Sequence, residues 1–238
     1  MSDFLPKNEN DYEPDIRNKI VENKNLNEEI EKGLIYKKCT FKNCECNTDF
    51  NSTVFIECVF RKINFDRADL SECVFIKCKI INCTIESTIF TESDINKTMF
   101  RGCEIENCDF SGSGNFGIIY DSCDLSNLNF SDSYFDEQSI INHNTFIDNI
   151  NLSNSDFNWN GHKWIECVLQ KYATTEEEKN LVRQISKDRD KCWRKLTDRK
   201  NKHIKKAFRS LAEWYKENNN KGHYVPNAIK NMAKNIED

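Results

Sequence analysis

The sequence has few of the residues that interrupt regular structure and few of the signals that direct a chain to a membrane. Its 238 residues include only 7 glycines and 3 prolines, which argues against flexible linkers. No apolar run approaches the roughly 20 residues that a membrane-spanning helix needs, and the first residues lack the pattern of a secretory signal. We therefore expect a folded, cytoplasmic protein with no membrane partner.

Motifs that carry catalytic chemistry are also lacking. The four histidines do not show the spacing of metal ligands on a helix. The sequence has no Gly-x-Ser-x-Gly motif, no phosphate-binding glycine loop and no dinucleotide fingerprint. We therefore expect that the protein is not an enzyme and that it has no catalytic residues, no cofactor and no metal.

A large apolar residue recurs at every fifth position along the middle of the chain. A period of five fits neither the alternation of a strand nor the 3.6-residue turn of a helix, so one interior must receive a side chain at each fifth step. The series continues to Ile140, although Asn115 and Tyr120 replace the usual residues inside SGSGNFGIIY. Because the phase is kept across this stretch, we expect a distorted side or a tight excursion there and not a large inserted loop. The residues that we assign to the interior are Phe50, Phe55, Phe60, Phe65, Leu70, Phe75, Ile80, Ile85, Phe90, Ile95, Phe100, Ile105, Phe110, Leu125, Phe130 and Phe135.

One unit of this pattern, Ala68-Asp69-Leu70-Ser71-Glu72, matches residue for residue the Ala-Asp/Asn-Leu-X-X repeat of the pentapeptide-repeat family. The sequence therefore resembles that family. The resemblance implies an all-β solenoid, a right-handed quadrilateral β-helix in which each five residues make one side and four sides make a coil. We expect roughly six coils in residues 34–160, because about twenty residues then make one coil.

Two shifts of phase interrupt the repeat. The series Tyr36, Phe41, Cys46 slips by one residue to reach Phe50, and a shift of two residues leads to Ile147. These shifts predict small bulges or corner loops near residues 46–50 and 141–147. Residues 1–33 are expected to cap the first coil, with 15–32 as a helical segment that stops at Gly33.

A small residue stands two positions before most of the large ones, and cysteine is frequent in this slot. The small interior residues that we assign are Cys58, Ala68, Cys73, Cys78, Cys83, Cys103, Cys108 and Cys123. A zinc site needs four ligands that converge on one point, whereas consecutive cysteines of a four-sided coil lie on different sides. We interpret these cysteines as free, buried fillers that stack on residues twenty positions away, not as metal ligands or disulfides.

Residues 161–238 have a different pattern, which predicts a C-terminal helical module. Two overlapping capping boxes in Thr174-Thr175-Glu176-Glu177-Glu178 predict the start of a helix. Apolar residues follow at helical spacing, so the module is expected to cap the solenoid and to mediate dimerisation or bind a protein partner. Its candidate binding residues are Trp193, Leu196, Ile204, Phe208 and Leu211, with the basic residues Arg194, Lys195, Arg199, Lys205 and Arg209.

The charge distribution leaves two further functions open. Residues 171–238 contain 18 Lys and Arg against 10 Asp and Glu, whereas residues 1–170 contain 16 against 29. Some relatives in the pentapeptide-repeat family resemble duplex DNA and act on type II topoisomerases, so the acidic solenoid suggests a DNA mimic. Its net charge over residues 34–160 is −9, about half the charge density of DNA over the same length. The basic tail could also bind nucleic acid. We favour a non-enzymatic interaction scaffold for an unknown protein partner over both.

Overall fold

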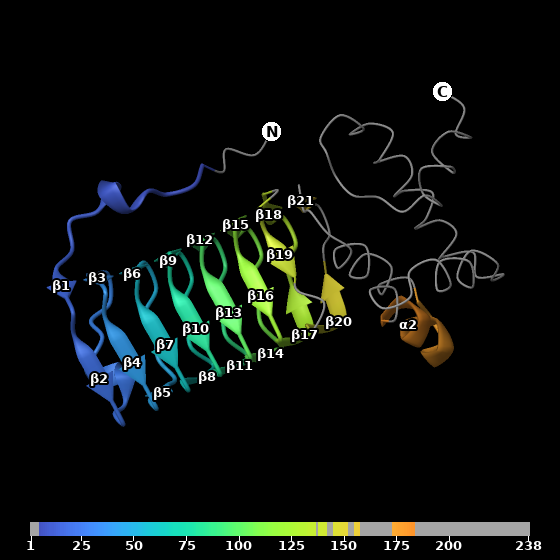
Figure 1. Ribbon diagram of the computed structural model, residues 1–238, viewed down its shortest axis with the longest axis horizontal. Coiled ribbons are helices and arrows are strands. Elements are labelled where there is room, and N and C mark those ends of the chain that lie inside the picture. The colour runs from blue at the N-terminus through green and yellow to red at the C-terminus, as the bar shows by residue number, and fades with distance from the viewer. Residues whose placement is uncertain (1–4, 137, 142–144, 152–154, 158–172, 184–238) are drawn as a thin grey trace. The chain divides into compact units, whose positions relative to one another are not determined.

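The computed structural model describes residues 5–136, 138–141, 145–151, 155–157 and 173–183 (Figure 1). The chain divides into two compact units, residues 1–159 and 160–238. The first unit is a parallel β-solenoid of about seven turns, as predicted. The described part of the second unit contains helix α2, Glu176–Arg183. Thr175 and Glu178 form the predicted capping box, in which the hydroxyl of Thr175 accepts from the Glu178 amide at 3.2 Å.

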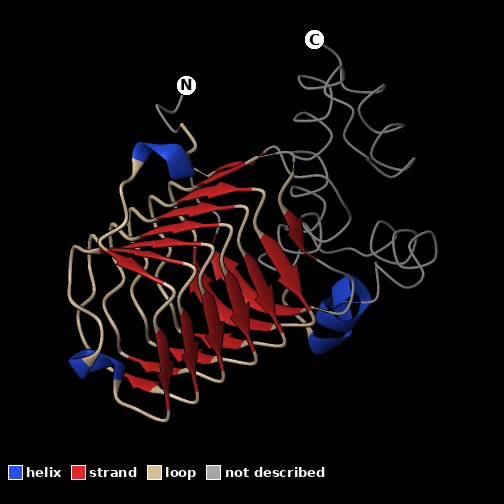
Figure 2. Ribbon diagram, turned by 60° about the vertical axis from the view of Figure 1, so that its left-hand side comes forward, coloured by secondary structure: helices blue, strands red, loops and turns tan. Residues whose placement is uncertain are grey.

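Three sides of each coil are parallel sheets, and neighbouring strands in a sheet come from successive coils (Figure 2). Sheet A contains β1 (Ile16–Arg17), β3 (Ile35–Lys37), β6 (Val54–Ile56), β9 (Val74–Ile76), β12 (Asp94–Asn96), β15 (Gly114–Phe116), β18 (Tyr134–Phe135) and β21 (Asp156–Phe157). Sheet B contains β2 (Ile20–Glu22), β4 (Thr40–Lys42), β7 (Val59–Arg61), β10 (Lys79–Ile81), β13 (Met99–Arg101), β16 (Ile119–Asp121) and β19 (Ile140–Ile141).

Sheet C contains β5 (Glu45–Cys46), β8 (Asn64–Asp66), β11 (Thr84–Glu86), β14 (Glu104–Glu106), β17 (Asp124–Asn129) and β20 (Phe146–Asn151). Most of the fourth side is joined by single bridges between coils, such as Asp49 with Asp69, but β17 and β20 extend onto it and pair Leu128 with Ile150 and Asn129 with Asn151. Two short 3-10 helices, η1 (Glu9–Asp11) and η2 (Leu26–Glu28), precede the regular coils. No helix within the described residues has the length and apolar character required to span a membrane.

The large interior residues stack in columns because pairing joins residues that are one coil apart. Phe55 pairs with Phe75, and Phe75 pairs with Ile95. All of the large and small residues assigned to the interior are at most 3% exposed. Aromatic rings stack along the columns, with centroids 4.4 Å apart in the Phe90–Phe110 pair. Such stacking adds a specific geometry to the burial of apolar area.

The small slot supplies hydrogen-bond donors as well as space. The thiol of Cys78 donates to the carbonyl oxygen of Phe55 in the preceding coil at 3.2 Å. In the next coil of the same column the hydroxyl of Thr98 donates to the Phe75 carbonyl, also at 3.2 Å. Cys103 and Cys123 make the same contact with earlier carbonyls. The interpretation of these cysteines as fillers therefore understates their role, since they also satisfy buried carbonyl groups.

The corners of the coil require a left-handed backbone at the second residue after each large one. Non-glycine residues adopt this conformation at many corners, for example Glu57 (φ 54°) and Lys62 (φ 52°). The conformation costs an L-residue about 1 kcal/mol or more. It is stabilised here because the amide of the corner residue donates to the next coil: Glu57 to the Ile76 carbonyl at 2.8 Å and Lys62 to that of Ile81 at 3.0 Å.

The helix expected over residues 15–32 is wrong. This segment contains β1, β2 and η2 and builds a first coil, so the strands begin before residue 34 and the expected six coils become about seven. The free edge of β4 makes a strand more favourable than a helix, because it pairs with β2. Val21, which is 2% exposed, faces the interior, whereas Ile20 is 75% exposed.

The distorted side expected in SGSGNFGIIY is also wrong. Asn115 pairs with Ile95 and Tyr120 with Phe100 in regular register, and both side chains are fully buried. The Asn115 amide fits the interior by donating to the hydroxyl of Ser113 at 2.9 Å.

The two phase shifts appear in the pairing. Tyr36 pairs with Phe55, one residue short of the regular spacing, and Leu125 pairs with Ile147, two residues beyond it. At the downstream shift Ile141 pairs with Tyr120 and is 9% exposed, whereas Ile140 is 45% exposed. The series of interior residues therefore passes through Ile141 instead of Ile140.

The donor role of the small slot is testable at Cys78 with two isosteric side chains. Cys78→Thr keeps a donor for the Phe55 carbonyl, as Thr98 does in its own coil, whereas Cys78→Val removes it. We expect the Val variant to be less stable than the Thr variant by about 1 kcal/mol or more, because a buried carbonyl loses its partner. If the two variants have equal free energies of unfolding in denaturant titrations, the slot requires a side chain of suitable size but not a donor.

Candidate interaction surfaces

The interior of the solenoid has no reactive centre within the described residues. The ten described cysteines are free and buried, and burial raises the pKa of the Cys73 and Cys108 thiols to about 12. No group of three or more His, Cys, Asp or Glu in the described part of the chain is arranged to hold a metal ion. With the interior occupied by packed side chains, any recognition must use the outer faces.

The outer face of sheet C is acidic along its described length. Side chains alternate along a strand, so the residues on either side of each interior residue point outward. None of these outward positions in the described strands of sheet C holds Lys or Arg. The carboxylates at these positions, named here the acidic face, are Glu45, Asp66, Glu86, Glu104, Glu106, Asp124 and Asp148.

Register brings like charges of the acidic face next to one another. Glu86 pairs with Asp66 on one side and with Glu106 on the other, and neighbouring strands lie about 4.8 Å apart. Burial, followed by the charges of Glu104 and Asp148, raises the pKa of Asp124. Like charges directly opposite in a sheet are destabilising, so the arrangement opposes the stability of the solenoid.

The outer face of sheet B is different, because basic residues occupy outward positions in four of its strands. Lys42 pairs with Arg61, and Lys79 and Arg101 follow in the next coils. Basic residues are therefore sorted to sheet B and away from sheet C, although Glu22 and Asp121 share the face of sheet B and form ion pairs there with Lys42 at 2.6 Å and Arg101 at 2.8 Å. The mean charge of residues 34–160 does not reveal this sorting, which becomes visible in the sequence only when it is read in steps of twenty residues.

The outer face of sheet A carries an apolar row that the sequence analysis missed. Val54, Ile56, Val74 and Ile76 form this row and are at most 8% exposed. Their strands read Val-Phe-Ile twice, a continuous apolar run that is typical of a strand buried on both faces. The apolar row could have been predicted from that run.

The N-terminal segment covers the apolar row. Residues 5–14, named here the strap, run from β1 back along this side of the solenoid (Figure 1). Tyr12 packs against the row. Glu9 forms an ion pair with Lys77 at 2.9 Å, and the carbonyl of Lys7 accepts from the Asn96 side chain at 2.6 Å. Burial raises the pKa of Tyr12 and of Asp94, because contact with this face removes water from both groups.

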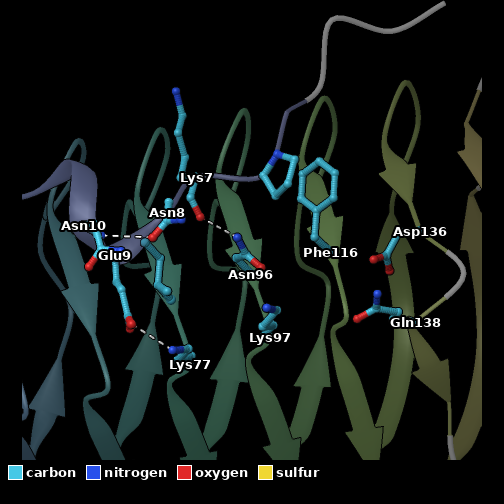
Figure 3. Close-up of a pocket in the computed structure, with 12 residues that line it drawn as sticks. Lys7, Asn8, Glu9, Asn10, Lys77, Asn96, Lys97, Phe116, Asp136 and Gln138 are labelled. Carbon is cyan, nitrogen blue, oxygen red and sulfur yellow. Dashed lines mark hydrogen bonds and ion pairs between the residues drawn. The ribbon is translucent and has the colours of Figure 1, made fainter.

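A pocket of about 410 Å³ lies between the strap and the solenoid. Its walls include Pro6, Ile76, Asn96, Lys97, Phe116 and Gln138. Figure 3 shows Phe116 and Lys97 beside the two strap anchors, which are the Glu9–Lys77 ion pair and the hydrogen bond from Asn96 to the Lys7 carbonyl. Asp136 closes one end and is held in place by the Gly117 amide and the Ser139 hydroxyl, both at 2.7 Å. The pocket combines apolar rings, amides and charges of both signs, which suits a peptide better than an apolar ligand.

The candidate binding residues of the C-terminal module, Trp193 to Leu211, lie outside the described residues. The interior residues lie where the repeat places them, but they face away from solvent and are not part of any interaction surface. The surfaces described here come instead from residues that flank the large interior ones.

Comparison with known proteins identifies the repeat. The family model of pentapeptide repeats matches residues 48–86 and 68–112, in eight copies. Comparison with curated proteins finds no match.

Solved structures that are similar to this chain include full-length QnrB1, a plasmid-mediated fluoroquinolone resistance protein. The two chains are 16% identical, and the match covers 59% of this chain and 92% of that chain with a TM-score of 0.24. HetL, a pentapeptide repeat protein involved in heterocyst differentiation regulation from the cyanobacterium Nostoc sp. strain PCC 7120, is 11% identical over 59% of this chain and 85% of its own, with a TM-score of 0.25.

The burial of the thiols predicts their reactivity. In a Cys167→Ser, Cys192→Ser variant, which leaves the ten described cysteines, we expect no reaction with a thiol reagent at mildly alkaline pH until the protein unfolds, because the thiolate is the reactive form. Fast labelling of any one cysteine in the native protein would contradict this. Since the folded pKa of Cys73 and Cys108 is raised, the contribution of these two thiols to stability should be lost as the pH rises above the ordinary thiol value of about 8.5. Hydrogen bonds from neighbouring thiols lower the pKa of Cys58 and Cys83, so these two thiols contribute in the opposite direction.

Proposed function

Since residues 48–112 place this chain in the pentapeptide-repeat family, we propose that it is a non-enzymatic scaffold that binds a protein partner through the acidic face. The observation that carries the proposal is the run of carboxylates in register on sheet C. A partner with a basic surface would match it along several coils, and complementary charge raises both the rate and the specificity of association.

The cost of the acidic face to the stability of the solenoid supports a functional role for that face. The solenoid does not require acidic residues at outward positions, since sheet B uses Lys42, Arg61, Lys79 and Arg101 at equivalent ones. Glu86 nevertheless lies between Asp66 and Glu106, at a cost of about 0.2–1 kcal/mol for each pair of like charges. A basic partner would relieve this repulsion, so binding energy and the relief of repulsion favour the same complex.

The C-terminal module would extend the scaffold. We assign to its amphipathic helices the capping, dimerisation or partner-binding role that its apolar residues Leu196, Ile204, Phe208 and Leu211 suggest. Its basic residues are assigned to the solvated side of those helices, with nucleic-acid binding as the less favoured use.

A DNA mimic that acts on a type II topoisomerase is the second candidate, and the acidic face favours it. In the column Asp66, Glu86, Glu106 the carboxylates repeat at the strand spacing of about 4.8 Å. The phosphates of one DNA strand follow one another every ~3.4 Å along the helix axis. The spacing is similar but longer, so a site that tolerates variation in phosphate position would be required.

Neutralising the centre of the acidic face should abolish partner binding without unfolding the protein. We expect Glu86→Gln, Glu104→Gln, Glu106→Gln to lower retention of the partner about tenfold or more in quantitative affinity capture. The matched control, Glu57→Gln, Glu72→Gln, Glu92→Gln, removes the same charge at coil corners and should retain it. The sheet C variant should also unfold at an equal or higher temperature, because like charges are removed. Identical sets of captured proteins from both variants would contradict the proposal.

Supercoiling by purified DNA gyrase separates the second candidate from the first. A DNA mimic should change supercoiling activity, with and without a quinolone, and the Glu86→Gln, Glu104→Gln, Glu106→Gln variant should lose this effect whereas the corner variant keeps it. If excess protein leaves supercoiling unchanged under both conditions, the second candidate is excluded while the scaffold proposal stands.

A further inference from the structure

The strap is attached to the solenoid in a different way from the coils. No residue of the described strap lies in a strand, so it does not extend the ladder that joins one coil to the next. Its contacts with sheet A include the ring of Tyr12 on the apolar row, the Glu9–Lys77 ion pair and the bond from Asn96 to the Lys7 carbonyl. Most strap side chains are exposed. The strap therefore behaves as a ligand that is tethered to its own binding site.

These contacts define what the outer face of sheet A recognises. Lys77 binds a carboxylate, and three residues later in the strap an aromatic ring covers the apolar row. Asn96, which is 5% exposed, binds a main-chain carbonyl. A main-chain contact requires no particular residue, whereas the carboxylate and the ring, which the turn η1 holds three residues apart, select a sequence.

The same face continues beyond the strap anchors. Phe116 lies in the same outward column as Ile76 and Asn96, and it is 6% exposed at the wall of the pocket. Lys97 lies one coil beyond Lys77 and also lines the pocket (Figure 3). The strap itself reaches this region, since Pro6 also lines the pocket, and a segment bound here in its place would meet a second ammonium group and a second apolar side chain.

We propose that the outer face of sheet A binds an acidic segment of a partner protein that, like the strap with its turn η1, places a carboxylate three residues before an aromatic ring, and that the strap occupies this site until the partner displaces it. Charge complementarity to Lys77 and Lys97 and the apolar row select this occupant. The site is separate from the acidic face and does not depend on the function proposed for that face.

The strap sets a threshold for binding. A tethered ligand acts at an effective concentration that reaches the millimolar range for short linkers, so a partner must compete with the strap. The apparent affinity of the partner equals its affinity for the open site multiplied by the fraction of sites that are open. The exposed Glu9–Lys77 ion pair adds little to the hold of the strap, because Lys77 is 45% exposed. Weakening the strap should therefore expose the site without disturbing the coils beneath it.

A labelled peptide with the sequence of residues 5–14, LPKNENDYEP, serves as the probe, and anisotropy measures its binding. In the full-length chain, Glu9→Lys with Tyr12→Ser opens the strap. We expect this opened chain to bind the peptide at least about tenfold more tightly than the wild-type chain. Circular dichroism and thermal unfolding should report an intact solenoid.

A charge exchange then tests the site itself. Lys77→Glu in the opened chain should lower the affinity for the peptide several-fold, because it places like charges opposite one another, and a peptide carrying Glu9→Lys should restore the affinity. Lys79→Glu on the outer face of sheet B is the matched control and should change nothing. An opened, folded chain that does not bind the peptide, or an unchanged affinity after Lys77→Glu, overturns the proposal. A doubled solution mass, with the strap of one copy cross-linked to sheet A of another, would assign the site to a second copy instead.

Discussion

The main-chain hydrogen bonds between successive coils are the constraint on which the rest of the structure depends. They form within the sheets and also at the corners, where residues such as Glu57 and Lys62 adopt a left-handed backbone to reach the next coil. Because the bonds join residues one coil apart, each side chain is placed in a column that is wholly inward or wholly outward. A shift of one residue would reverse a column. The two shifts of phase are therefore absorbed between strands, and Phe55 still pairs with Tyr36, as Ile147 does with Leu125.

The inward columns explain why closely spaced cysteines, which look like metal ligands or reactive thiols, have a structural role. The closely spaced cysteines of CVFIKCKIINC lie on successive sides, where Cys78 contacts the carbonyl oxygen of Phe55 and Cys83 that of Phe60. Each thiol meets a carbonyl group of the preceding coil that would otherwise be buried without this donor. Serine and threonine make the same contact elsewhere, as at Ser133 and Thr98. Cysteine, serine and threonine suit the slot because they are small and can donate, but a donor is not required at every position, since Ala68 also occupies the slot.

The outward columns contain residues that the solenoid fold itself does not require. Neither the carboxylates around Glu86 nor the apolar row around Ile76 is needed to close a coil, and each would reduce stability or solubility if it faced water alone. The strap covers the apolar row, whereas no segment within the described residues is seen to cover the acidic face. A rigid solenoid that presents two faces of different chemistry is well suited to hold two different surfaces at a constant separation, and this is the physical basis of the scaffold that we propose.

The sequence by itself determined the solenoid, its inward residues and the burial of its cysteines, because a chain with a large side chain at every fifth position from Phe50 to Phe110 must bury them all in one interior. Only the tertiary structure decided that Ile16–Glu22 would be strands, since a polar segment with scattered isoleucines is compatible with a helix until the edges of β3 and β4 offer it partners. It also brought Glu86 between Asp66 and Glu106 and Tyr12 onto the apolar row. These neighbours are distant in the chain, and a local pattern contains no information about which distant residues will share a face.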